Sequence, residues 1–191
     1  VLKHRFQRDD FDDLHVAIQG LGAVGWGVAE RLHAAGARLT VADVREERVV
    51  EARETFGAEA ASPDEIHAVE ADIYSPCALG GVIDETTVGA IHAKAVAGAA
   101  NNQLATPQAG VALAARGVLY APDYVLNAGG IISGLEAFFH MPGRAAVAVP
   151  PLDERLALIG DRLDEIFERS AAERRTPEVT AERMARELIG R

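Results

Sequence analysis

Two periods of hydrophobic and polar positions alternate along most of this chain. Between about residues 14 and 122, short apolar runs bounded by glycine or polar residues are separated by segments with apolar positions at helical spacing. The short runs predict β-strands and the longer segments predict helices. The predicted strands are 15–19, 38–42, a weak one near 58–61, 71–74, 95–98 and 118–121. The predicted helices between them are 24–35, 45–56, 63–68, 86–92 and 107–116.

This alternation predicts the α/β class, with helices on both faces of a parallel sheet. Right-handed crossovers are the default for such connections. The strand count fits a Rossmann-type doubly wound sheet of order 3-2-1-4-5-6, whose ligand cleft lies beyond the carboxyl ends of the strands.

The pattern changes after Pro122. Residues 125–139 predict a helix interrupted near its start by Gly129 and Gly130, and residues 142–151 predict a loop. One face of an amphipathic helix follows, and its apolar positions are Leu152, Leu156, Ile159, Leu163, Ile166 and Phe167. A last helix is predicted over 178–189.

The chain therefore divides into three predicted parts, ending with these C-terminal helices. Residues 1–13 form a polar leader carried over from an upstream domain, 14–131 form the Rossmann domain, and 132–191 form a helical extension.

Composition narrows the class of protein. Of the 191 residues, 49% are hydrophobic, enough for a substantial core. The net charge of −10 argues against a nucleic-acid partner, because phosphate contacts need clustered lysines and arginines. No apolar run is long enough to predict a membrane span. The charged N-terminus and the single cysteine favour the cytoplasm. Since the first residue is Val1, we expect a processed chain or a piece of a longer protein.

A glycine-rich motif follows the first predicted strand. Residues 16–25 read Val-Ala-Ile-Gln-Gly-Leu-Gly-Ala-Val-Gly, which is G-x-G-x-x-G at the start of a helix. Gly20 allows a tight turn, Gly22 leaves room for phosphates, and Gly25 lets the helix pack closely on the strand. Asp43, at the end of the next strand, is placed to accept hydrogen bonds from a ribose. The motif predicts a dinucleotide site with the pyrophosphate at the helix N-terminus.

The cofactor at this site has alternatives. The same glycines occur in ordinary strand–turn–helix units, and another nucleoside cofactor such as S-adenosylmethionine fits a similar turn. Asp43 favours NAD, because its carboxylate repels a 2′-phosphate. Arg45 attracts that phosphate, but it opens the following helix, so we expect Asp43 to dominate.

Three further motifs follow later strands. They are DIYSPCALG at Asp72–Gly80, AANNQL at Ala99–Leu104 and YAPDYVLNAGG at Tyr120–Gly130. By their residues, order and spacing, the chain resembles the C-terminal, NAD-binding half of amino-acid dehydrogenases of the leucine, phenylalanine and valine type. Glutamate dehydrogenases are more distant relatives of the same architecture. The resemblance covers about 14–131 and resumes weakly over 152–189.

The resemblance implies reversible oxidative deamination of an aliphatic or aromatic L-amino acid to a 2-oxo acid and ammonia, with NAD as hydride acceptor. It implies Asn101 near the nicotinamide ribose or carboxamide, and Asn127 near the amino or carboxylate group of the substrate. The implied cofactor-binding residues are Gly20, Gly22, Ala23, Val24, Gly25, Asp43, Val44, Cys77, Ala78, Leu79 and Asn101.

Some of these residue types have simpler interpretations. Cys77 is interpreted as a small packing residue, because no activating base is identifiable. Asn102 is either a helix or turn cap or a ligand. Asp72 either contacts a group in the cleft or ends a strand. The six histidines show no ligand spacing, so we expect neither a catalytic histidine nor a metal site.

The resemblance also implies an upstream substrate domain that supplies the catalytic lysines. This chain has only Lys3, in the leader, and Lys94, which precedes a strand and so lies opposite the cleft. We therefore expect no catalytic residue here, an inactive fragment, and a homo-oligomeric full-length protein. Residues 132–151 depart from the family where its members line the substrate side-chain pocket. The alternative function is a stand-alone NAD-sensing regulatory module without catalysis.

Overall fold

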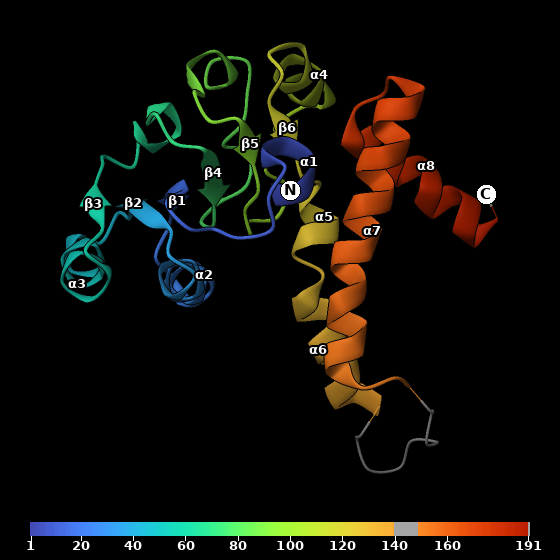
Figure 1. Cartoon of the computed structure of the whole chain (residues 1–191), viewed down its shortest axis with the longest axis horizontal. Helices are drawn as coiled ribbons and strands as arrows, with labels where there is room; N and C mark the ends of the chain where they lie inside the picture. Colours follow the sequence, from blue (N-terminus) through green and yellow to red (C-terminus); the bar gives the residue numbers. More distant parts are fainter. Residues whose placement is uncertain (140–148, 191) are drawn as a thin grey trace.

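The computed structural model describes residues 1–139 and 149–190, and its centre is one parallel sheet (Figure 1). The strand order is β3-β2-β1-β4-β5-β6, and every neighbouring pair is parallel. The predicted class and strand order are therefore confirmed. The strands are β1 (His15–Gln19), β2 (Arg38–Ala42), β3 (Glu59–Ala60), β4 (Ile73–Pro76), β5 (Ala95–Val96) and β6 (Leu119–Tyr120).

The connections between strands are helical but unequal in length. They are α2 (Ala23–Ala34), α3 (Glu46–Phe56), η1 (Ile66–Ala68), η2 (Val88–Ala90) and α4 (Pro107–Ala115). The predicted helices 63–68 and 86–92 are each only one 3-10 turn. Gly89 has low helix propensity, and the Asp84 side chain binds the N–H groups of Thr86 and Thr87 in a turn that competes with a longer helix.

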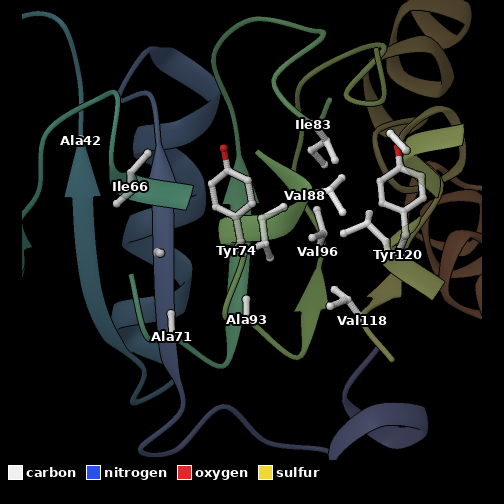
Figure 2. Close-up of a cluster of buried hydrophobic side chains, with 14 residues drawn as sticks. Ala42, Ile66, Ala71, Tyr74, Ile83, Val88, Ala93, Val96, Val118 and Tyr120 are labelled. Atoms are coloured by element: carbon white, nitrogen blue, oxygen red, sulfur yellow. The ribbon is translucent and has the colours of Figure 1, made fainter. Parts of the chain in front are cut away.

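Two hydrophobic clusters cover the two faces of the sheet. Successive strand residues point to opposite faces, so Ala17 belongs to one cluster while Val16 and Ile18 belong to the other. Figure 2 shows the first cluster, in which Tyr74 and Tyr120 lie on one face of the sheet with Ile83, Val88 and Val96. Helices α2 and α3 cover the other face.

After β6, the described residues form four helices, α5 (Asp123–Leu126), α6 (Gly129–Phe139), α7 (Leu152–Glu173) and α8 (Pro177–Ile189). The interruption predicted near the start of 125–139 is present, but it lies at Asn127 and Ala128, between α5 and α6, and Gly129 and Gly130 begin α6 instead of breaking the helix. Helix α7 continues past the predicted face, and α6 lies beside its first half in an arm that extends away from the sheet (Figure 1). Of the predicted loop at 142–151, residues 142–148 lie outside the described residues.

The N-terminal leader contains a short helix, α1 (Leu2–Phe6), that returns to α7. The Asp164 carboxylate on α7 accepts hydrogen bonds from Lys3 Nζ, at 3.1 Å, and from the His4 ring, at 2.8 Å. The leader is thus tied to the last third of the chain. Among the described helices, none combines the length and hydrophobicity that crossing a membrane would need.

Candidate functional site

The glycine turn joins β1 to α2 with little space between them. Gly20 has a φ of +96°, a conformation that L side chains rarely adopt, and its N–H donates to the Ala42 carbonyl at 2.7 Å. A Cβ built on Gly25 would lie 1.9 Å from the Gly20 carbonyl oxygen. Both positions therefore require glycine, one for the turn and the other for the close approach of the helix.

Gly22 differs from these two glycines. It is the N-cap of α2 and has an ordinary φ of −66°. A Cβ built there would meet nothing within 4 Å. As a glycine, it offers no side chain to the first N–H groups of the helix, which leaves an open, partly positive helix end beside the turn.

Asp43 follows β2 and reaches into this turn. Its Oδ2 accepts the Leu21 N–H at 2.6 Å, and its Oδ1 accepts the Arg45 N–H at 2.9 Å. Burial raises the pKa of the Asp43 carboxyl, but hydrogen bonds from Leu21 and Arg45 outweigh burial and hold that pKa below its ordinary value of 3.8. The carboxylate is therefore ionised at neutral pH and anchored to the turn.

The Arg45 side chain lies against the same carboxylate. Its Nε donates to Asp43 Oδ1 at 3.2 Å, while the Asp43 side chain is only 7% exposed. The cation that would attract a 2′-phosphate is thus paired with the anion that would repel it. Val44 between them is 88% exposed, an apolar side chain beside the turn.

The segment after β4 packs directly on the glycine turn. The Cys77 N–H donates to the Gln19 carbonyl at 2.7 Å, and a Cβ built on Gly20 would lie 2.6 Å from the Ala78 Cβ. Burial raises the pKa of the Cys77 thiol, so it stays protonated, in agreement with a packing role. Leu79 is 79% exposed at the edge of this segment.

Asn101 and Asn127 form a pair farther along the same edge. The Asn127 Nδ2 donates to the Asn101 Oδ1 at 2.7 Å. Asn101 lies in the loop after β5, and a Cβ built on Gly80 would come within 2.4 Å of its carbonyl oxygen. The structure therefore brings the loops after β1, β4 and β5 together with the end of α5, at the carboxyl edge of the sheet.

Sequence reasoning missed the group that holds the Asn101 loop. The Asp123 carboxylate accepts the Asn102 N–H and, at 3.0 Å, the Tyr120 hydroxyl. The buried Gln103 amide donates to the carbonyls of Gly98 and Ala100. Asn102 caps no helix through its side chain; its backbone adopts a φ of +52° and its N–H is bound by Asp123. Polar residues inside a loop carry no periodic signal that could have identified this arrangement.

Asp72 and Lys94 lie at the opposite edge of the sheet. Asp72 precedes β4 rather than ending a strand, so both interpretations from the sequence are wrong. Its Oδ1 accepts a hydrogen bond from Lys94 Nζ at 2.8 Å. The predicted position of Lys94, away from the carboxyl edge, is confirmed. The structure shows no metal-binding group of histidine, cysteine or acidic residues within the described ranges.

The sheet order and the turn between β1 and α2 define an α/β protein of Rossmann type. The family model for Glutamate/Leucine/Phenylalanine/Valine dehydrogenase matches residues 39–141. The chain belongs to this family, as its motifs predict.

Individual relatives agree with this assignment. Leucine dehydrogenase of Geobacillus stearothermophilus is 38% identical over 187 residues, which are 98% of this chain and 49% of that protein. The crystal structure of L-tryptophan dehydrogenase from Nostoc punctiforme is similar with a TM-score of 0.90 and 37% identity, over 99% of this chain and 56% of that one. The hetero-hexameric glutamate dehydrogenase from Thermus thermophilus gives a TM-score of 0.67 and 26% identity, over 94% and 46% of the two chains. The chain thus spans about half the length of the curated relatives it matches.

Proposed function

We propose that this chain is the nicotinamide-cofactor-binding part of an NAD-dependent amino-acid dehydrogenase. The observation that carries the proposal is the Asp43 carboxylate, hydrogen-bonded into the glycine turn beside the open N-terminus of α2. The relatives named leucine, tryptophan and phenylalanine dehydrogenase support an aliphatic or aromatic L-amino acid as the substrate of the whole protein.

The chain's residues fit such a cofactor. The open side of Gly22 and the N–H groups of Ala23 and Val24 would hold the pyrophosphate at the helix end. Asp43 retains acceptor capacity for ribose hydroxyls. The exposed side chains of Val44 and Leu79 would provide apolar contacts on either side of the turn.

The bound nicotinamide would accept the hydride released from the amino-acid Cα. On this edge, Ala78 and Cys77 would lie beside the ring. The Asn101 amide oxygen accepts from Asn127, so the Asn101 NH₂ group stays available to donate to a carboxamide or ribose. The Asn127 oxygen stays available to accept from the substrate's amino group. The pairing of Asn127 with Asn101 favours an enzyme over an NAD sensor, because binding of the cofactor alone does not need a residue placed for the substrate's amino group.

The deamination itself needs a base that reaches the substrate amine. Lys94 pairs with Asp72 at the far edge, and Lys3 pairs with Asp164 on α7. Neither serves that role, and we propose that the upstream substrate domain supplies it.

Cofactor choice tests the proposal directly. We expect NADH to bind more tightly than NADPH, because a 2′-phosphate would meet the Asp43 carboxylate. Fluorescence titration of the chain with each dinucleotide measures both affinities. Equal or tighter binding of NADPH would mean that Arg45 rather than Asp43 controls the site, and binding of neither would reject the proposed function.

A further inference from the structure

The loop that carries Asn101 is held on both sides of that residue. On one side, the Ala100 N–H donates to the Pro76 carbonyl at 2.9 Å. On the other side, the Asn102 carbonyl accepts from the Gly81 N–H at 2.7 Å. Asn101 itself is exposed between these two neighbours. The place of its side chain therefore depends on the hydrogen bonds that its neighbours make.

The Asp123 side chain supplies a further bond to this loop. Asp123 is only 7% exposed, and its Oδ2 accepts the Asn102 N–H while its Oδ1 accepts the Tyr120 hydroxyl at 3.0 Å. Burial and the charge of Asp123 raise the pKa of Tyr120, so that hydroxyl keeps its proton and donates. A carboxylate is an acceptor at both oxygens, so it suits two donors. The bond also holds Asn102 at a φ of +52°, where side chains are uncommon.

The main chain of Asp123 holds the second asparagine of the pair. The Asn127 N–H donates to the Asp123 carbonyl at 2.8 Å, and Asn127 is the residue that ends α5. The Asn127 Nδ2 in turn donates to the Asn101 Oδ1 at 2.7 Å. Asp123 therefore links the two segments that carry the asparagine pair. Of its bonds to them, only the one to the Asn102 N–H requires its carboxylate.

We propose that Asp123 is a positioning residue for the nicotinamide end of the cofactor, an inference that rests on the proposed function. Its carboxylate fixes Asn102, and thereby the direction from which the Asn101 NH₂ group meets a nicotinamide carboxamide or ribose. Asp123 acts through Asn101 and not on the cofactor itself. It follows β6, and β4 and β5 separate that strand from β1 and its glycine turn. The contacts to the pyrophosphate and adenosine should therefore not depend on Asp123.

Two ligands separate the two ends of the cofactor. NADH and ADP both carry adenosine and two phosphates, but ADP lacks the nicotinamide riboside. In isothermal titration calorimetry, Asp123→Ala should lower the affinity for NADH about tenfold, comparable to the loss of a well-placed hydrogen bond. The affinity for ADP should stay within about twofold, because distant sites behave independently.

A conservative variant and a matched control accompany Asp123→Ala. Asp123→Asn keeps an oxygen for the Asn102 N–H, and its NH₂ group can donate to the Tyr120 oxygen, so it should restore NADH affinity. Asp72→Ala is the control, because Asp72 also accepts a main-chain N–H, that of His15 at 3.1 Å, but at the opposite edge of the sheet. It should leave NADH affinity unchanged. Urea unfolding shows whether each variant is folded, and Asp123→Ser is the second variant if Asp123→Ala does not fold.

The outcomes distinguish this inference from the proposed function. Equal losses of NADH and ADP affinity in Asp123→Ala would overturn the inference, because they would indicate general damage to the fold. Unchanged NADH affinity in the folded variant would also overturn it, as would an equal loss in Asp72→Ala. If the unmodified chain bound neither NADH nor ADP, the proposed function itself would fail.

Discussion

At the scale of single residues, the three glycines of the turn have different requirements. Gly20 needs a positive φ, and Gly25 needs the absence of a Cβ. Gly22 needs neither in the protein alone, because its φ is ordinary and its surroundings are open. In the proposed function, this open space at the N-terminus of α2 is where the pyrophosphate would approach.

Gly22→Val tests this distinction. The valine methyl groups would occupy the space where the pyrophosphate approaches, so NADH affinity should fall at least about a hundredfold, comparable to the loss of two charge-assisted hydrogen bonds. The free energy of unfolding should change little. Urea unfolding and NADH titration of the same preparation measure both quantities.

Gly25→Ala is the matched comparison. Its Cβ meets the Gly20 carbonyl oxygen, so the free energy of unfolding should fall by about 1–3 kcal/mol, the usual cost of overpacking. If a folded Gly22→Val protein bound NADH with unchanged affinity, the glycine turn would not be part of the cofactor site.

At the scale of elements, the ion pair at the amino edge joins two strands. Asp72 precedes β4, and Lys94 precedes β5. Burial raises the pKa of Asp72, but hydrogen bonds from Lys94 and the His15 N–H hold it below its ordinary value of 3.8. A carboxyl with a lowered pKa stabilises the fold above its ordinary pKa, and that stabilisation is lost as the pH falls through the lowered value.

Lys94→Gln should therefore have a pH-dependent effect on stability. Lys94 is 56% exposed, so we expect a loss of only about 0.5 kcal/mol near neutral pH, and a smaller loss in acid where Asp72 becomes protonated. Urea unfolding at both pH values measures this. NADH affinity should stay unchanged, because the pair lies at the edge opposite the glycine turn. A drop in affinity would contradict the assignment of the site to the carboxyl edge.

The bounds of an element could be predicted from the sequence where its own residues showed a complete pattern of buried positions. Strands β1 and β2 agree with the predicted 15–19 and 38–42, because each alternates between two buried faces beside a clear glycine boundary. The predicted helices 63–68 and 86–92 each reduced to a single turn. In the second of them, hydrogen bonds from the Thr86 and Thr87 N–H groups to the Asp84 carboxylate favour a turn over a longer helix. The break between α5 and α6 placed Asn127 beside Asn101, which a continuous helix would not have done.

At the scale of the whole molecule, the chain has a six-stranded sheet with two covered faces, and both of its lysines are already paired, Lys3 with Asp164 on α7 and Lys94 with Asp72 at the amino edge. We expect the isolated chain to fold and bind NADH, yet not to oxidise leucine, valine or phenylalanine, because no lysine reaches the substrate amine. Following NADH formation at 340 nm, with and without the upstream segment joined to the chain, tests this. Robust deamination by these 191 residues alone would contradict the proposal that the lysines come from another domain.

The sequence by itself determined the class of fold, the order of the strands, the glycine turn and the family. These depend on local periodicity and on residues close together in the chain. Only the tertiary structure decided that Asp43 binds Leu21, that Asn101 pairs with Asn127, and that Asp123 binds Asn102. Such contacts join residues from separate elements, and hydrophobic spacing specifies which face of an element is buried but not which distant polar group it meets. The pairing of these polar groups therefore depends on how the fold brings the ends of separate strands and helices together.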